Sequence, residues 1–343
     1  MSCHFDAVVG NVALVDRLCR DVDEGSLSHA YILEGPSGTG RHTLALSVAA
    51  AISCEHKADS KAKTPCGKCR NCQKIFSGNS PDIISIGLEG DRASIGVEAI
   101  RQMKNDIYIA PNDLDFKIYI INNSDSMTPQ AQNAFLLSLE EPPEYIIFFL
   151  ICENSTSLLE TVRSRAPSLR TQRLSDDEVK EHLLKTDRRA ISLHEESPDE
   201  FASVIKVSAG RIGYALSLLD TKHRKSVLEQ KKTARNIISM ISSSDRGGAF
   251  EVISALGNKR QDVCRQLSYL EEAVRDLILL KKDEAVSLCF FEDAELACEL
   301  ASNFTSEALF ALYDAAAQAI SDLEANANVR LALMNMMQRA RLI

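Results

Sequence analysis

A glycine-rich loop between a β-like run and a helical pattern is the feature that most constrains the fold of this 343-residue chain. The apolar run HAYILEG, residues 29–35, predicts a strand, and RHTLALSVAAAIS, residues 41–53, predicts a helix. The loop between them, GPSGTG, contains Gly35, Gly38 and Gly40. Gly35 and Gly40 have the spacing of a phosphate-binding loop, whose backbone amides cradle phosphates between a strand and a helix.

Three further short apolar runs follow in the first half of the chain, at residues 81–90, 117–125 and 144–154. Short, near-continuous apolar strands that are separated by helical patterns indicate a parallel sheet with both faces covered. Before the last run, Thr128 and Pro129 are typical of a helix start, and Pro142–Pro143 of a helix end.

The patterns after about residue 174 are helical, and Ser175 and Glu178 have the spacing of a capping box. We therefore predict an α/β region followed by an all-α region. The predicted parts are an α/β domain over residues 1–174 with a cysteine-bearing insertion at about 54–78, a small helical domain over 175–220, and a larger helical domain over 221–343.

The charge of the chain limits its partners. A formal net charge of −9 makes indiscriminate binding of a phosphate backbone a poor prediction, so nucleic-acid contact would need a local patch or a partner. The N-terminus lacks the basic-then-apolar pattern of a signal peptide. The longest apolar run, residues 145–152, is too short to span a bilayer, so we expect no membrane association and a cytoplasmic location.

Four cysteines in the pattern C-x11-C-x2-C-x2-C predict a metal site made by Cys54, Cys66, Cys69 and Cys72. Four thiolates suit tetrahedral zinc, and the last three lie on one polar loop, which is untypical of core cysteines. Iron–sulfur binding is the strongest alternative. A redox pair or four unrelated thiols are others. The remaining six of the ten cysteines are scattered in apolar patterns and are interpreted as structural thiols.

The positions after Gly40 do not hold the residues of a working phosphate loop. Such a loop continues with Lys, which contacts the outer phosphates, and with Ser or Thr, which binds magnesium. Arg41 keeps the charge but is bulkier and forked, and His42 offers nitrogen where magnesium prefers oxygen. Thr43 comes one position late, about 100° around the helix.

The acidic pair of an ATPase site is missing as well. One carboxylate at the end of a neighbouring strand would hold magnesium, and another would orient the attacking water. The run KIYIINN ends in Asn122 and Asn123, and Asp125 lies further along, where it is badly placed to substitute for them. Because several parts are absent together, we predict no ATP hydrolysis. The loop amides with Arg41 could still hold a nucleotide, or the loop is retained for packing, which is the interpretation that we favour.

The segments HAYILEGPSGTG, PCGKCRNC, KIYIINNSDSMTPQAQNAFLLSLEEPP and SRA occur in this order, and together they resemble the bacterial clamp-loader subunits of the AAA+ class. The resemblance runs from about Phe5 to residues 210–220, and the helical last third fits in length and character. It implies a RecA-like domain with a zinc module, then a helical lid, then a helical collar domain that oligomerises.

Within that family, the resemblance separates two types of subunit. The hydrolysing tau/gamma type carries Lys-Thr in the loop and Asp-Glu on the strand, so this chain is more similar to the non-hydrolysing delta-prime type. The family's SRC motif supplies an arginine finger to the adjacent subunit's ATP site, and here it reads Ser164-Arg165-Ala166. The hydrolysing subunits also have a sensor arginine where this chain has Gly213.

The resemblance therefore implies a stator without a catalytic centre of its own, which is part of a DNA polymerase III holoenzyme. Expected partners are the tau/gamma and delta subunits and, through the complex, the sliding clamp and primed DNA. The alternatives are a divergent tau/gamma-like ATPase and a zinc-stabilised interaction module outside replication. On sequence alone, Arg165 would be interpreted as a surface salt bridge; the family motif favours a finger.

The strongest basic run is TKHRKSVLEQKKTAR, residues 221–235. It could line a channel for DNA, but a solvated helix face is the more common role of such a run.

Overall fold

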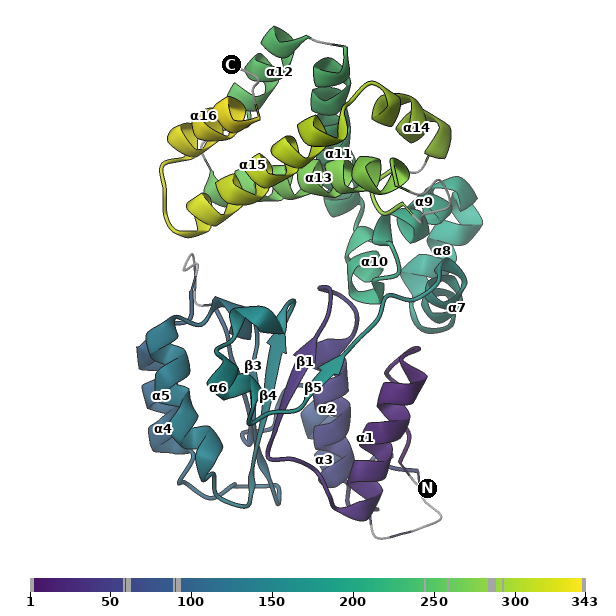
Figure 1. Ribbon diagram of the computed structural model, residues 1–343. Helices are drawn as coiled ribbons and strands as arrows, with labels where there is room; N and C mark the ends of the chain where they lie inside the picture. Colours follow the sequence, from purple (N-terminus) through teal and green to yellow (C-terminus); the bar gives the residue numbers. More distant parts are fainter. Residues whose placement is uncertain are drawn as a thin grey trace. The chain divides into compact units, whose positions relative to one another are not determined.

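The computed structural model in Figure 1 describes residues 3–57, 59, 63–88, 90, 94–243, 245–257, 259–282, 288–291 and 293–340. The chain forms two compact units. The first comprises Met1–Thr186 with Gly210–Tyr214, and the second comprises Asp187–Ala209 with Ala215–Ile343.

A five-stranded parallel sheet, in the order β2-β3-β4-β1-β5, forms the middle of the first unit. The strands are β1 (Ala30–Glu34), β2 (Ile83–Ile86), β3 (Lys117–Ile121), β4 (Ile146–Cys152) and β5 (Ser168–Arg170). The first four lie within the runs that the sequence predicts, and β5 was not predicted. Glu34 pairs with Cys152 and Ile121 with Leu150, so the carboxyl ends of β1, β3 and β4 lie at one edge of the sheet.

Helices cover both faces of this sheet, as Figure 1 shows: α1, α2 and α3 lie on one side, and α4, α5 and α6 on the other. The helices of the first unit are α1 (Val12–Glu24), α2 (Arg41–Ile52), α3 (Arg70–Phe76), α4 (Val97–Asp106), α5 (Pro129–Glu140), α6 (Glu160–Arg163) and α7 (Asp176–Thr186). Alternate strand residues enter opposite cores, because successive side chains of a strand point to opposite faces. Leu33 and Phe149 pack with α2, whereas Ile32 and Phe148 pack with α5.

The predicted helix boundaries are confirmed where a capping residue marks them. Thr128 accepts a hydrogen bond from the Ala131 N–H, and Pro129 is the first residue of α5. Ser175 and Glu178 form the capping box, in which each side chain accepts a hydrogen bond from the backbone N–H of the other residue.

All the regular secondary structure that is described in the second unit is helical. Its helices are α8 (Arg188–Glu196), α9 (Pro198–Ser208), α11 (Thr221–Ser242), α12 (Arg246–Ser254), α13 (Arg260–Leu280), α14 (Ala294–Ser302), α15 (Ser306–Glu324) and α16 (Val329–Arg339). The long α13 packs against α11, α14 and α15, and α15 packs against α16. Helix α10 (Ile212–Leu218) has residues in both units.

The predicted fold class, α/β followed by all-α, is confirmed. The domain boundaries at residues 174 and 220 remain predictions. In the part of the chain that the structure describes, none of the helices is both long and apolar enough to cross a bilayer.

Candidate nucleotide loop and metal centre

The glycine loop lies at the carboxyl edge of the sheet, between β1 and α2. Gly35, Gly38 and Gly40 all have positive φ values, of 146°, 83° and 86°. A Cβ atom on Gly35 would come within 2.3 Å of the Thr171 Oγ1 and 2.7 Å of the Thr171 carbonyl oxygen. The loop is therefore packed tightly against the end of β5, and only glycine fits at position 35.

Gly213 contacts the other side of this loop. Its N–H donates a hydrogen bond of 2.9 Å to the Gly38 carbonyl oxygen. A Cβ atom on Gly213 would lie 3.0 Å from the Gly38 Cα. Gly213 thus lies directly beside the loop, and its contact with Gly38 is made by backbone atoms.

The Arg41 side chain is buried, with 9% of its surface exposed. Its Nη1 donates to the Cys152 carbonyl oxygen at the end of β4, and the Gly35 N–H donates to the same oxygen. Burial lowers the pKa of the Arg41 guanidinium, and the negative charges of Glu153 and Asp125 oppose that shift. The guanidinium that could hold a phosphate is therefore hydrogen-bonded to the end of β4.

Two residues that follow β3, Asn122 and Asp125, also form hydrogen bonds with nearby residues. The Asn122 Nδ2 donates to the Ser85 Oγ at 2.8 Å, and Asn123 adopts a left-handed conformation with φ 51°. The Asp125 Oδ2 accepts a hydrogen bond of 2.9 Å from the Glu153 N–H. The structure thus brings Arg41, Asp125 and the end of β4 together, which the sequence spacing alone did not indicate.

A pair of hydroxyl groups joins the loop to β5, and sequence reasoning missed it. The Thr39 Oγ1 and the Thr171 Oγ1 are 2.7 Å apart, and Thr39 also donates to the Pro36 carbonyl oxygen at 2.8 Å. Thr171 follows a strand of three residues that has no apolar run, so the sequence carried no signal for this contact.

Arg165 lies just after α6, and 36% of its side chain is exposed. Its Nη2 lies 2.8 Å from the Glu140 Oε1, and its Nη1 donates to the Thr161 carbonyl oxygen at 2.9 Å. Exposed ion pairs of this kind contribute about 1 kcal/mol or less to stability, so the contact with Glu140 is readily exchanged for another anion.

The four cysteines of the predicted metal site lie together. The Sγ atoms of Cys54, Cys66, Cys69 and Cys72 are all within 4.8 Å of one another, although they come from the end of α2, a loop and α3. The Cys66 Sγ accepts N–H bonds from Lys68 and Cys69, at 3.5 Å and 3.3 Å. Four sulfur atoms at about 2.3 Å from a shared zinc ion would be spaced in this way.

The thiol pKa values differ within the cluster. Burial raises the pKa of Cys54 and Cys72. Burial would raise that of Cys66 as well, but N–H groups of Lys68 and Cys69 and neighbouring thiols lower it to about 6. A bound divalent cation would favour the thiolate form of all four cysteines, because its positive charge would offset the cost of burying their negative charges.

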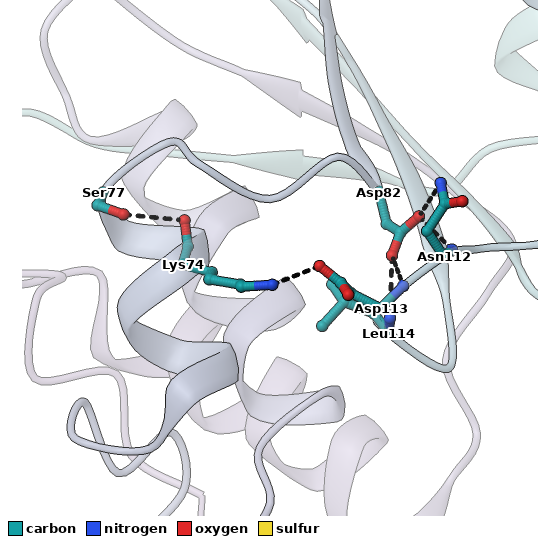
Figure 2. Close-up of polar contacts among 6 residues, drawn as sticks. All are labelled: Lys74, Ser77, Asp82, Asn112, Asp113 and Leu114. Carbon is teal, nitrogen blue, oxygen red and sulfur yellow. Dashed lines mark hydrogen bonds and ion pairs between the residues drawn. The ribbon is translucent and has the colours of Figure 1, made fainter.

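Two ion pairs attach the segment that carries the four cysteines, the candidate metal module, to the loop before β3, and a buried carboxylate fixes that loop. The Lys74 Nζ lies 2.5 Å from the Asp113 Oδ2, and the Lys57 Nζ lies 2.5 Å from the Asp115 Oδ2. Figure 2 shows how Asp82, which is fully buried, accepts the N–H groups of residues 112–114 at 2.7–2.9 Å. Asp82 thereby fixes the loop that Lys74 contacts.

Similarity to known proteins decides the family of this chain. Residues 10–175 match the family described as "DNA polymerase III, delta subunit". Subunit tau of Bacillus subtilis DNA polymerase III is 32% identical over 217 residues, which are 63% of this chain and 37% of that protein. Subunit delta' of the same organism is 35% identical over 171 residues, which are 50% of each chain. The chain belongs to the AAA+ family of bacterial DNA polymerase III clamp-loader subunits.

Other members of the clamp-loader family match over similar lengths. Subunit tau/gamma of Haemophilus influenzae is 28% identical over 254 residues, which are 74% of this chain and 35% of that protein. The chain thus spans half or less of the length of these three relatives. A solved gamma-subunit-related protein from Thermotoga maritima is 20% identical to this chain. The match covers 96% of this chain and 98% of that one, with a TM-score of 0.45. The family that the sequence motifs indicated is confirmed.

Proposed function

We propose that this chain is a non-hydrolysing, delta-prime-type clamp-loader subunit that supplies Arg165 to the ATP site of a neighbouring subunit. The observation that carries the proposal is the state of Arg41. Its guanidinium is buried against the Cys152 carbonyl oxygen at the edge where a working lysine would meet phosphates. His42 and Asn122 stand where magnesium chemistry needs oxygen ligands and a carboxylate.

Arg165, the residue that this chain would supply to a neighbouring ATP site, is present. A guanidinium that a neighbour supplies in trans stabilises the charge on the transferring phosphoryl group, and such fingers contribute about 10³–10⁵ in rate. Arg165 is half-exposed, and its contacts with Glu140 and Thr161 hold it at the surface after α6. A phosphoryl group would compete for it better than one solvated carboxylate does, because the phosphoryl group carries more charge.

The partners in this proposal are the other subunits of the complex. The tau/gamma subunits would bind and hydrolyse ATP, the delta subunit would contact the sliding clamp, and primed DNA would be reached through the assembly. We infer a cytoplasmic location from this role. Zinc would be held by Cys54, Cys66, Cys69 and Cys72 as a structural ion, because four protein thiolates leave no open position for substrate.

A divergent ATPase of the tau/gamma type is the second candidate, since several of the matched relatives are tau or gamma subunits. In that case Arg41 would have to leave the Cys152 carbonyl oxygen, and Asp125 or Glu153 would have to serve magnesium. Magnesium-dependent ATP turnover by the isolated chain would favour this candidate.

The test is ATP turnover by a reconstituted clamp loader with primed DNA and clamp, in which Arg165→Ala is compared with the wild type. Arg163→Ala is the matched control, because Arg163 is an exposed arginine at the end of α6, two residues before Arg165. We expect Arg165→Ala to lower turnover at the site that the finger serves by about 10³-fold or more, without loss of assembly. The control should behave as the wild type does.

Two results would count against the proposal. Equal turnover with Arg165→Ala in a fully assembled complex would make the chain a scaffold. Failure of the wild-type chain to join the tau/gamma and delta subunits would remove it from the clamp loader and favour an interaction module elsewhere.

A further inference from the structure

A pocket of about 340 Å³ lies in the second unit, between α11 and the segment that leads into α14. Leu228, Phe290, Phe291 and Leu296 supply its apolar surface. Leu228 is partly exposed on α11, with 39% of its surface open, so the pocket continues into an apolar spot on the helix.

Two buried charges hold the floor of this pocket in place. Asp276 is fully buried and accepts the N–H groups of Cys289, Phe290 and Phe291, at 2.9, 2.7 and 3.3 Å. Lys231 is 8% exposed, its Nζ donates to the Phe290 carbonyl oxygen at 3.3 Å, and it lies 4.8 Å from the centre of that ring. The floor is therefore built on fixed backbone and is formed before any ligand arrives.

The rim of the pocket is positive. Lys232 and Arg235 line it and are exposed, and neither forms an ion pair with any residue that the structure describes. Asp293 is the one carboxylate among the described lining residues, and it accepts the N–H groups of Glu295 and Leu296 as the cap of α14. Residues 221–235 contain six Lys or Arg and a single Glu, in a chain whose net charge is −9.

We propose that this pocket binds an acidic peptide segment of a partner protein. One bulky apolar side chain of the peptide would enter between Leu228 and the two phenylalanines, and its flanking carboxylates would pair with Lys232 and Arg235. Charge complementarity with an apolar anchor is a common mode of peptide recognition, in which the anchor gives affinity and the rim gives specificity and speed.

The pocket suits a peptide better than a nucleic acid. Single-stranded nucleic acids bind exposed aromatic faces on which bases stack. Phe290 and Phe291 are only 6% and 7% exposed, they pack edge-to-face against each other, and Lys231 covers a face of Phe290. The net negative charge of the chain also opposes a long polyphosphate more strongly than a short peptide.

The experiment measures fluorescence anisotropy of a labelled peptide that contains a single Leu among Asp and Glu residues, titrated with the full-length chain. A second peptide has Ser in place of Leu, and labelled oligothymidylate is the nucleic-acid probe. The variant Lys232→Glu/Arg235→Glu is compared with Lys222→Glu/Lys225→Glu. Both variants change the charge of exposed positions on α11 equally, but the second pair lies about 10–15 Å along the helix from Lys232.

We expect the Leu peptide to bind, the Ser peptide to bind at least about fivefold more weakly, and Lys232→Glu/Arg235→Glu to weaken binding by about tenfold. The control pair should change affinity by about twofold or less, through long-range charge alone. The proposal is overturned if the peptide does not bind, if both double variants weaken it equally, or if oligothymidylate binds more tightly than the peptide. None of these measurements depends on ATP turnover or assembly, so the proposal stands or falls separately from the finger.

Discussion

Arg41 illustrates at the scale of one residue what the sequence could and could not predict. The sequence shows that Arg stands after Gly40, where the phosphate-loop pattern has Lys. It does not predict where the guanidinium goes, since that depends on how near the end of β4 comes to the first turn of α2. The carbonyl oxygen that receives it belongs to Cys152, which is 111 residues away in the sequence.

Gly35 gives a sharp prediction at this scale. Gly35→Ala would place a methyl group 2.3 Å from the Thr171 Oγ1, at a φ of 146° that other residues rarely adopt. We expect a loss of about 2–4 kcal/mol in the free energy of unfolding, measured by urea denaturation.

Gly96→Ala is the matched control, because Gly96 has an ordinary φ of −78° and a Cβ atom there would have no described atom beyond its chain neighbours within 4 Å. Its loss should be about 1 kcal/mol or less. Similar losses in the two variants would mean that the loop yields to Thr171 more easily than the contacts indicate.

At the scale of the elements, the first four strands were predictable because each is a run of buried apolar residues between polar segments. Strand β4, for example, is buried along all seven of its residues. Strand β5 could not be found in this way, since only Leu169 of its three residues is buried. It is recognised as a strand by its pairing with β1. For the candidate metal module, the cysteine spacing predicted which four thiols lie together, but nothing in it indicated the ion pairs that attach the module to residues 113–115.

The metal module allows a prediction about Cys72, which is fully buried among the other three thiols. Cys72→Ser should reduce bound zinc from about one ion per chain to a small fraction and lower the midpoint of thermal unfolding, because a structural zinc site contributes directly to folding. Elemental analysis and thermal melts measure both effects.

Cys298→Ser is the control, since Cys298 is exposed and far from the cluster in sequence. It should retain zinc. A wild-type chain that purifies without metal and with reactive thiols would contradict the assignment, and an iron content in place of zinc would correct it.

Asp82 belongs to the same scale, because it joins β2 to the loop before β3. In Asp82→Asn, an NH₂ group would replace an oxygen that now accepts N–H bonds from residues 112–114 (Figure 2). Two donors would then face each other in a buried place, and we expect a loss of about 2–3 kcal/mol in the free energy of unfolding.

Asp113→Asn tests the other half of the contact. Lys74 lowers the pKa of the Asp113 carboxyl by hydrogen bonding to it, but that pair lies near the surface. Its removal should therefore cost clearly less than Asp82→Asn in the same urea denaturation. The reverse order would show that the ion pair, and not the buried carboxylate, holds the loop.

At the scale of the whole molecule, the positions at which an ATPase site would have its magnesium and phosphate ligands come from segments that are far apart in the chain. We predict that Arg41→Lys/His42→Thr does not give the isolated chain magnesium-dependent ATP turnover, since Asn122 and Asn123 still provide no carboxylate. A phosphate-release assay checks this, with an active tau/gamma subunit as the positive control. Turnover by the double variant would mean that Asp125 or Glu153 serves magnesium.

The division of the chain into units has a consequence for its synthesis. The chain passes between the two units three times, and the short return Gly210–Tyr214 belongs to the unit that contains the sheet. That return brings the Gly213 N–H to the Gly38 carbonyl oxygen and the Gly210 carbonyl oxygen to the Leu174 N–H. A ribosome releases Gly38 long before Gly213, and α8 and α9 are made in between. A nascent chain that ends at Thr186 could therefore pair its strands. Its glycine loop would lack the contact with Gly213 until the residues up to Tyr214 have left the ribosome.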